Sequence, residues 1–205
     1  MPMPRREMLF RCLATGVLTS LLPPESAVAA MLEGERVPAT PRVEVGPFFK
    51  RGSPERRRIA PGNAAGVPLL VEGQVVDTRG EPVPGAVLEV WQADHFGEYD
   101  LAGYDYRGHV ASDAKGTYGF ESVVPGHYPG RVAQHIHYLV NAPGHRPFST
   151  QLYFATDSAF EGDPARNYRK DPLVPSASLI RPVVLEPRDK GTLARVRFEL
   201  VLERA

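Results

Sequence analysis

Short runs of alternating apolar and polar residues recur along the chain from residue 69 onward. In the run at residues 194–202, alternate apolar side chains would lie on one face of a strand and charged side chains on the other. No long apolar pattern with a helical period appears beyond residue 30. The pattern predicts strands at residues 69–77, 86–94, 107–113, 117–124, 135–142, 150–155, 179–186 and 194–202.

Glycine, proline and aspartate separate these runs, as hairpin turns require. The stretches DTRGEPVPG and DAKG, which begin at Asp77 and Asp113, are examples. Many short strands at this spacing predict an all-β fold, a β-sandwich or partly closed barrel with long irregular loops. We expect residues 30–68 to form an extended N-terminal arm and residues 69–205 to form a single domain, with a loop and a short helix at residues 156–178.

Residues 1–29 have the layout of an export signal. Arg5 and Arg6 precede a modest apolar segment, and small residues at positions 27–29 offer a cleavage site. Arg11 interrupts the apolar segment, which is too short to span a bilayer as a stable helix. This layout predicts twin-arginine export, a periplasmic or extracellular location and no stable membrane insertion after cleavage. A buried N-terminal helix is the competing prediction.

Composition narrows the functional classes. The chain has 205 residues and a formal net charge of zero at pH 7, which argues against nucleic acid as its main partner. The one cysteine, Cys12, lies within the predicted signal. A mature chain that begins near Ala30 therefore has no disulfide, no thiolate nucleophile and no cysteine-ligated zinc or iron–sulfur site.

Two histidines stand one residue apart in the predicted strand at residues 135–142. His135 and His137 would share one face of that strand, at a Cα separation of about 6 to 7 Å, while Ile136 and Tyr138 would face the other way. Two imidazoles in this arrangement can converge on one metal ion. They can equally be hydrogen-bonded histidines of the core or the surface, so neighbouring motifs must decide.

Two tyrosines precede this pair in suggestive surroundings. Tyr99 ends the stretch WQADHFGEY, and Tyr128 lies between two Pro-Gly pairs in PGHYPG. With these flanks, the chain resembles the intradiol ring-cleavage dioxygenases, and the matching stretches are residues 40–49, 66–100, 107–129 and 135–154. The resemblance implies a non-haem Fe(III) cofactor with Tyr99, Tyr128, His135 and His137 as its ligands.

The ligand types suit that ion. Fe(III) is a hard Lewis acid that favours anionic phenolate oxygens, and imidazoles complete the site. The resemblance implies that O2 cleaves the bond between the two hydroxylated carbons of a catechol-type substrate and yields a cis,cis-muconate-type diacid. Tyr128 would accept a proton as it leaves the metal, and no external reductant is needed. A homo-oligomer is compatible with this sequence, as is a monomer.

The sequence also departs from the family pattern. The family has an arginine three residues before the first histidine, where this chain has Val132, and Arg131 lies one residue earlier. The role of Arg131 in stabilising the substrate ring is therefore in question. Gln151 matches a family glutamine beside the substrate. We expect Tyr128, Arg131 and Gln151 to be the catalytic residues.

Two other functions compete with this one. The stretch EGQVVDTRGEPVPGAVLEVW, residues 72–91, also resembles transthyretin-like or carboxypeptidase-regulatory β-sandwiches, which serve as non-catalytic binding modules. A zinc or copper enzyme would combine His135 and His137 with His127 or His145.

Overall fold

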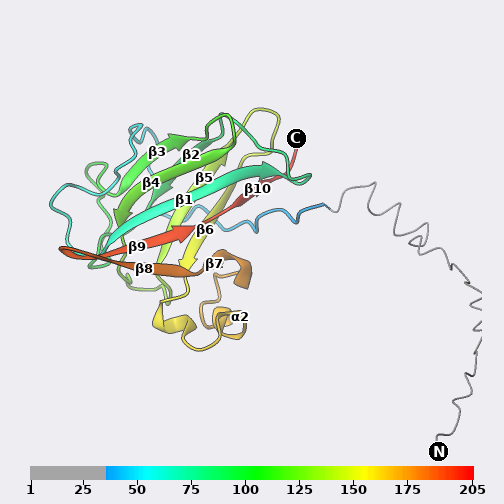
Figure 1. Cartoon of the computed structure of the whole chain (residues 1–205). Coiled ribbons are helices and arrows are strands. Elements are labelled where there is room, and N and C mark those ends of the chain that lie inside the picture. Colours follow the sequence, from blue (N-terminus) through cyan, green and yellow to red (C-terminus); the bar gives the residue numbers. More distant parts are fainter. Residues whose placement is uncertain (1–35) are drawn as a thin grey trace, which may run out of the picture. The chain divides into compact units, whose positions relative to one another are not determined.

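Strands supply most of the regular structure in residues 36–205, the part of the chain that the computed structural model describes (Figure 1). The predicted export signal lies outside the described residues. The all-β prediction is confirmed. The strands are β1 (Pro68–Asp77), β2 (Val87–Trp91), β3 (Arg107–Ala111), β4 (Thr117–Val123), β5 (His135–Asn141), β6 (Phe148–Phe154), β7 (Ile180–Arg181), β8 (Val183–Arg188), β9 (Gly191–Arg197) and β10 (Leu200–Leu202).

The strands form two sheets of five. In the first sheet, β1 pairs with β4 along one edge and with β9 and β10 along the other, and β8 pairs with β9. The second sheet has the order β3-β2-β5-β6-β7. One cluster of buried apolar side chains joins the two sheets, with Val71 of β1 and Phe120 of β4 from the first and Leu88 of β2 and Ile136 of β5 from the second. The fold is therefore a β-sandwich.

The predicted strand at residues 194–202 is divided into β9 and β10 at Phe198. Its register does not shift, since Leu69 lies opposite Ala194 and Val75 lies opposite Leu200. The carbonyl of Phe198 accepts a hydrogen bond from the buried hydroxyl of Tyr118 at 2.6 Å. The N–H of Phe198 still donates to the carbonyl of Glu72 at 2.9 Å, and regular pairing resumes at Leu200.

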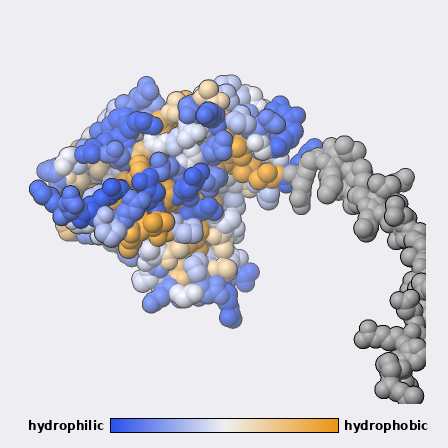
Figure 2. All heavy atoms as spheres, in the orientation of Figure 1, coloured by the Kyte–Doolittle hydropathy of each residue, from blue (hydrophilic) through white to orange (hydrophobic). Residues whose placement is uncertain are grey.

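The predicted strand at residues 179–186 is also divided. Pro182 separates β7, which pairs with β6 in the second sheet, from β8, which pairs with β9 in the first. Proline cannot donate to a ladder, so the chain changes sheets at this point. In β8, Val184 and Leu185 are exposed, and hydrophobic residues gather over this part of the face seen in Figure 2.

Residues 36–67 contain no regular strand and run along both sheets. Backbone N–H groups of Val37, Thr40 and Val43 donate to Thr78, Val201 and Ser149, in that order. Further along, isolated bridges join Glu55 to His109 and Arg58 to Glu121. At Gly46 the arm lies against the outer face of β5, where a β-carbon would be 3.4 Å from Cε1 of His137.

Residues 155–179 connect β6 to β7 with short helical turns: η1 (Ser158–Phe160), α2 (Pro164–Asn167), η2 (Tyr168–Lys170) and η3 (Ala177–Leu179). The side chain of Asp157 caps η1 by accepting from Ala159, and Asp163 caps α2 by accepting from Arg166. Within residues 36–205, none of the helices is long and apolar enough to cross a membrane.

Candidate metal centre

The two closely spaced histidines lie at the start of β5, on the face turned away from the apolar core. Their Nε2 atoms are 3.2 Å apart. In the sheet register, His137 lies opposite Trp91 of β2 and Gln151 of β6, and His135 lies opposite Tyr153 of β6. These side chains form one surface because opposed residues of neighbouring strands share a face.

Two loops bring Tyr99 and Tyr128 to this surface. The hydroxyl of Tyr99, in the loop after β2, lies 3.1 Å from Nε2 of His137. Tyr128, in the loop after β4, packs its ring against Tyr99 and His135, with centroids 5.4 and 5.7 Å apart. Phe48 of the arm stacks on Tyr99 with centroids 4.2 Å apart. The structure thus gathers the residues predicted as metal ligands at one end of the sandwich.

The two tyrosine loops touch backbone to backbone at a pair of glycines. The N–H of Gly126 donates to the carbonyl of Asp94 at 2.7 Å. A β-carbon on Gly126 would lie 2.6 Å from the backbone nitrogen of Gly97, and one on Gly97 would overlap the carbonyl of His127. Gly97 also has a φ of +88°, which other residues adopt only with strain. The spacing of the two tyrosines therefore depends on these glycines.

Each imidazole is oriented by a contact at its other nitrogen. Nδ1 of His135 lies 2.8 Å from the carbonyl of Ala133, which accepts its proton and leaves a lone pair on Nε2. Nδ1 of His137 lies 3.1 Å from Nε2 of Gln151, and Trp91 stacks on the imidazole with centroids 4.8 Å apart. Metal binding through Nε2 of His137 puts the proton on Nδ1, so Gln151 must then turn its amide oxygen toward it.

Burial sets the charge states of these side chains. Burial, with a contribution from Arg131, lowers the pKa of His135 to about 4, and burial and His135 lower the pKa of His137 well below its usual value. Both imidazoles are therefore neutral at pH 7 and able to bind a metal. Burial and the neighbouring Tyr128 raise the pKa of Tyr99. Ionising that phenol requires a strongly Lewis-acidic cation.

These donor atoms are spaced as the ligands of one metal ion would be. The Nε2 atoms of His135 and His137 lie 3.2 Å apart. The hydroxyl of Tyr99 lies 3.1 Å from Nε2 of His137. Ligands at right angles on one ion, with bonds of about 2.1 Å, lie about 3 Å apart. Within residues 36–205, no group of three His, Cys, Asp or Glu side chains is placed to hold a metal. Tyrosine oxygen would therefore have to complete the site.

Arg131 reaches this site although it lies one residue further from the first histidine than the arginine of the family pattern does. Its Nη1 lies 3.4 Å from Nε2 of His135, and its Nη2 donates to Oε1 of Gln151 and to the hydroxyl of Tyr153, each at 3.1 Å. Its Nε donates to the carboxylate of Asp171 at 3.2 Å. Burial disfavours the charged guanidinium, but Tyr153 and Asp171 outweigh it and raise the pKa of Arg131.

The structure adds three residues that the sequence did not indicate: Phe48, Tyr153 and Asp171. Tyr153 stands two residues after Gln151 on β6, so the strand period carried a signal for it. Phe48 and Asp171 lie in segments without regular periodicity, where sequence spacing says nothing about the distance to β5. The catalytic roles of Tyr128, Arg131 and Gln151 stay predictions.

The histidines on which the zinc or copper alternative depends lie apart from this pair. Nε2 of His127 lies 3.1 Å from the carboxylate of Asp157. His145 follows the far end of β5, and its Nδ1 lies 2.8 Å from the carbonyl of Pro143. The positions of these side chains do not support a site that adds either one to His135 and His137.

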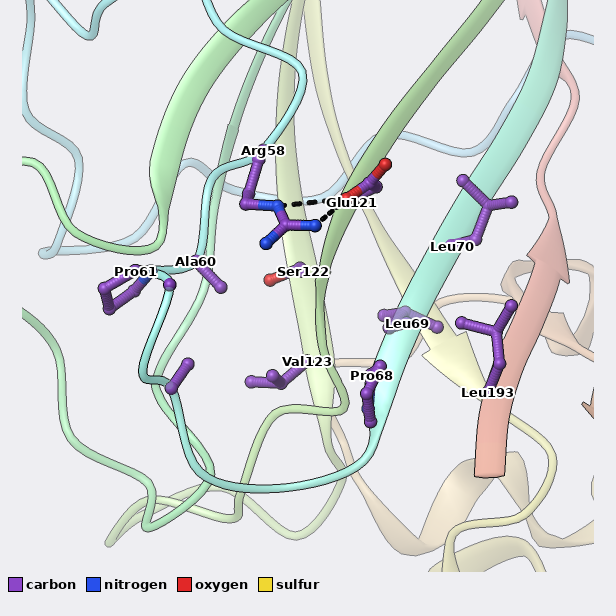
Figure 3. Close-up of a pocket in the computed structure, with 12 residues that line it drawn as sticks. Arg58, Ala60, Pro61, Pro68, Leu69, Leu70, Glu121, Ser122, Val123 and Leu193 are labelled. Atoms are coloured by element: carbon purple, nitrogen blue, oxygen red, sulfur yellow. Dashed lines mark hydrogen bonds and ion pairs between the residues drawn. The ribbon is translucent and has the colours of Figure 1, made fainter. Parts of the chain in front are cut away.

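A pocket of about 350 Å³ opens elsewhere, against β1 and β4 (Figure 3). Leu69, Leu70 and Leu193 contribute apolar side chains to it, and Arg58 and Glu121 form an ion pair of 2.7 Å at its wall. No histidine or tyrosine lines this pocket. It is therefore separate from the candidate metal centre.

Comparison with known proteins identifies relatives along most of the described chain. Residues 45–204 match the family described as Dioxygenase. A hydroxyquinol 1,2-dioxygenase of Nocardioides simplex is 35% identical, over 91% of this chain and 72% of that protein. A catechol 1,2-dioxygenase of Pseudomonas sp. (strain EST1001) is 30% identical, over 85% of this chain and 67% of that protein.

Solved structures agree with these relatives. The dioxygenase domain of a dioxygenase carbohydrate-binding protein fusion from Streptomyces sp. SirexAA-E has a TM-score of 0.68 and 35% identity, and covers 82% of this chain and 100% of that domain. A hydroxyquinol 1,2-dioxygenase from Pseudomonas putida DLL-E4 has a TM-score of 0.71 and 27% identity, over 87% of this chain and 71% of that one. The match spans both sheets and favours an enzyme over the binding-module alternative. The chain therefore belongs to the intradiol ring-cleavage dioxygenase family.

Proposed function

We propose that the chain uses Fe(III), held by Tyr99, Tyr128, His135 and His137, to cleave a catechol-type aromatic with O2 to a cis,cis-muconate-type diacid. The observation that carries this proposal is the convergence of two neutral imidazoles and a tyrosine hydroxyl. Nε2 of His137 lies 3.2 Å from Nε2 of His135 and 3.1 Å from the hydroxyl of Tyr99. When bound, the ion would supply the Lewis acidity that ionises the catechol and makes its ring reactive toward O2.

The two tyrosines have different roles in this proposal. Tyr99 contacts His137 through its hydroxyl and is stacked on Phe48, so it is a fixed ligand. Among the described residues, Tyr128 is placed by ring contacts with Phe48, Tyr99 and His135. The family resemblance implies that its hydroxyl leaves the metal and accepts a proton from the incoming substrate.

Hydroxyquinol and catechol are the first substrates to test. Relatives from Nocardioides simplex, Rhodococcus opacus and Corynebacterium glutamicum, all hydroxyquinol 1,2-dioxygenases, are 35 to 36% identical to this chain. Catechol 1,2-dioxygenases from Pseudomonas and Acinetobacter are 29 to 32% identical. These values support a catechol-type substrate that carries two adjacent hydroxyl groups.

The visible spectrum of the iron-loaded protein tests this function. We expect a red-brown band from charge transfer between tyrosinate and Fe(III), which shifts when catechol or hydroxyquinol is added without O2. Admitting O2 should then give the ring-opened diacid with no added reductant. Protein that takes up no iron and stays colourless after iron loading would overturn the proposal.

We also propose that residues 1–29 direct export by the twin-arginine route. The support is the sequence alone: Arg5 and Arg6, the apolar segment and the small residues at positions 27–29. We expect protein recovered from the periplasm or medium to begin near Ala30. A variant in which both arginines are replaced by lysine should remain in the cytoplasm. Mass spectrometry of the amino terminus and cell fractionation would check this, and full-length protein found only in the cytoplasm would contradict it.

A further inference from the structure

Arg131 stands in an unusual place and still lies against the metal-facing surface of β5. The sequence puts it four residues before His135, where the family pattern has the arginine three residues before. Its side chain is 5% exposed, and its nitrogens contact His135, Gln151, Tyr153 and Asp171. Contacts of the side chain, and not the family's spacing between arginine and histidine, must therefore hold the guanidinium here.

Two of these four contacts depend on whether the metal is bound. Nη1 of Arg131 faces Nε2 of His135, whose lone pair a metal would take. The contact with Oε1 of Gln151 is lost if that amide turns its oxygen toward His137. In the loaded site, Nη1 and the N–H of Nη2 that had faced Gln151 are then the guanidinium donors left to face a substrate. The contacts with Asp171 and Tyr153 are the ones that stay.

Asp171 binds both the side chain and the backbone of the loop that carries Arg131. Its Oδ2 accepts from Nε of Arg131 and from the N–H of Ala133, each at 3.2 Å, and its Oδ1 accepts from the N–H of Leu173 at 3.0 Å. Its side chain is 2% exposed. A carboxylate this deeply buried interacts strongly with its partners because water does not screen it.

We propose that Asp171 is a positioning residue that holds the guanidinium of Arg131 against the substrate side of the metal centre. Its Oδ2 links the guanidinium, through Nε, to the loop backbone, through the N–H of Ala133, two residues before His135. It thereby compensates for the displacement of the arginine along the sequence. This inference rests on the proposed function, since Arg131 acts on the substrate only if the enzyme cleaves a catechol.

A second buried aspartate of the same segment provides a matched control. Asp157 accepts from the loop N–H of Gln134 at 2.6 Å and caps η1 through Ala159 at 2.8 Å. Asp171 likewise binds a loop N–H and the N–H of a residue two positions further on. Asp157 contacts His127 and not Arg131. The two aspartates thus accept the same kinds of backbone hydrogen bonds, but only Asp171 also binds the guanidinium of Arg131.

The test compares Asp171→Asn with Asp157→Asn in iron-loaded full-length protein. The asparagine oxygen can still accept from a backbone N–H, but it lacks the charge that holds Arg131. We expect Asp171→Asn to lower kcat about 10- to 100-fold, as outer-sphere substitutions do. Its iron content, its visible band and its anaerobic affinity for catechol should stay close to the wild type. Asp157→Asn should lower Tm, because it weakens the same kind of backbone contacts, but it should change kcat less than about 3-fold.

A double-mutant cycle separates positioning from a general structural role. If Asp171 acts through Arg131, Asp171→Asn should have no further effect on kcat in an Arg131→Ala protein. The double variant should also have a higher Tm than Arg131→Ala, which leaves the carboxylate buried without its charge partner. An equal loss of kcat in both backgrounds, loss of iron from Asp171→Asn, or wild-type kcat in that variant would overturn the inference. A wild-type protein without turnover would instead refute the proposed function.

Discussion

We expect the His137→Ala variant to lose bound iron, the visible band and ring cleavage together. Nε2 of His137 contacts both Nε2 of His135 and the hydroxyl of Tyr99, so its removal breaks the centre of the donor set. Substitutions of outer partners alone lower metal affinity by about 10- to 100-fold, and loss of a ligand should cost more than that. Metal analysis after dialysis against a chelator, alongside kcat, would measure the effect.

His145→Ala is the matched control for this variant. His145 follows the opposite end of β5 and bonds the carbonyl of Pro143. The His145→Ala variant should keep its iron and its turnover. Tyr99→Phe guards against a folding defect, because it removes the hydroxyl and keeps the ring stacked on Phe48. Full activity in His137→Ala or Tyr99→Phe would show that these residues do not bind the metal.

Gly97→Ala should disrupt the metal centre from a position that makes no contact with the metal. The new β-carbon would overlap the carbonyl of His127, next to Tyr128, and the residue would be strained at a φ of +88°. Left-handed strain and overpacking together should lower the free energy of unfolding by about 3 kcal/mol. The loops of Tyr99 and Tyr128 must move apart, so we expect weak iron binding and a bleached visible band. Chemical denaturation and metal analysis would measure these two effects.

Gly80→Ala isolates the strain from the clash. Gly80 has a φ of +80° in the turn after β1, and a β-carbon there meets nothing within 4 Å. The free energy of unfolding of the Gly80→Ala variant should fall by about 1 kcal/mol, and the variant should keep its iron. If Gly97→Ala bound iron as tightly as Gly80→Ala, close packing of the two loops could not be what sets the tyrosine positions.

The strand pattern was readable because it depends on local chain geometry. Alternating side chains place Ile136 and Tyr138 in the core and His135 and His137 on the opposite face, whatever the rest of the fold does. Breaks at Pro182 and Phe198 were harder to predict. The first depends on a change of sheet, and the second falls where the alternation of apolar and charged residues continues without a signal.

The sequence by itself determined the all-β class and, through a family resemblance, the identity of the tyrosines and histidines. Tertiary structure decided how Phe48 stacks on Tyr99 and how Asp171 binds Arg131, across 40 positions of sequence in the second case. These partners come from the arm and from an irregular connection, where no period relates one residue to another. Their distances to β5 follow only from how the whole chain packs, because contacts between segments remote in sequence form when the sandwich closes.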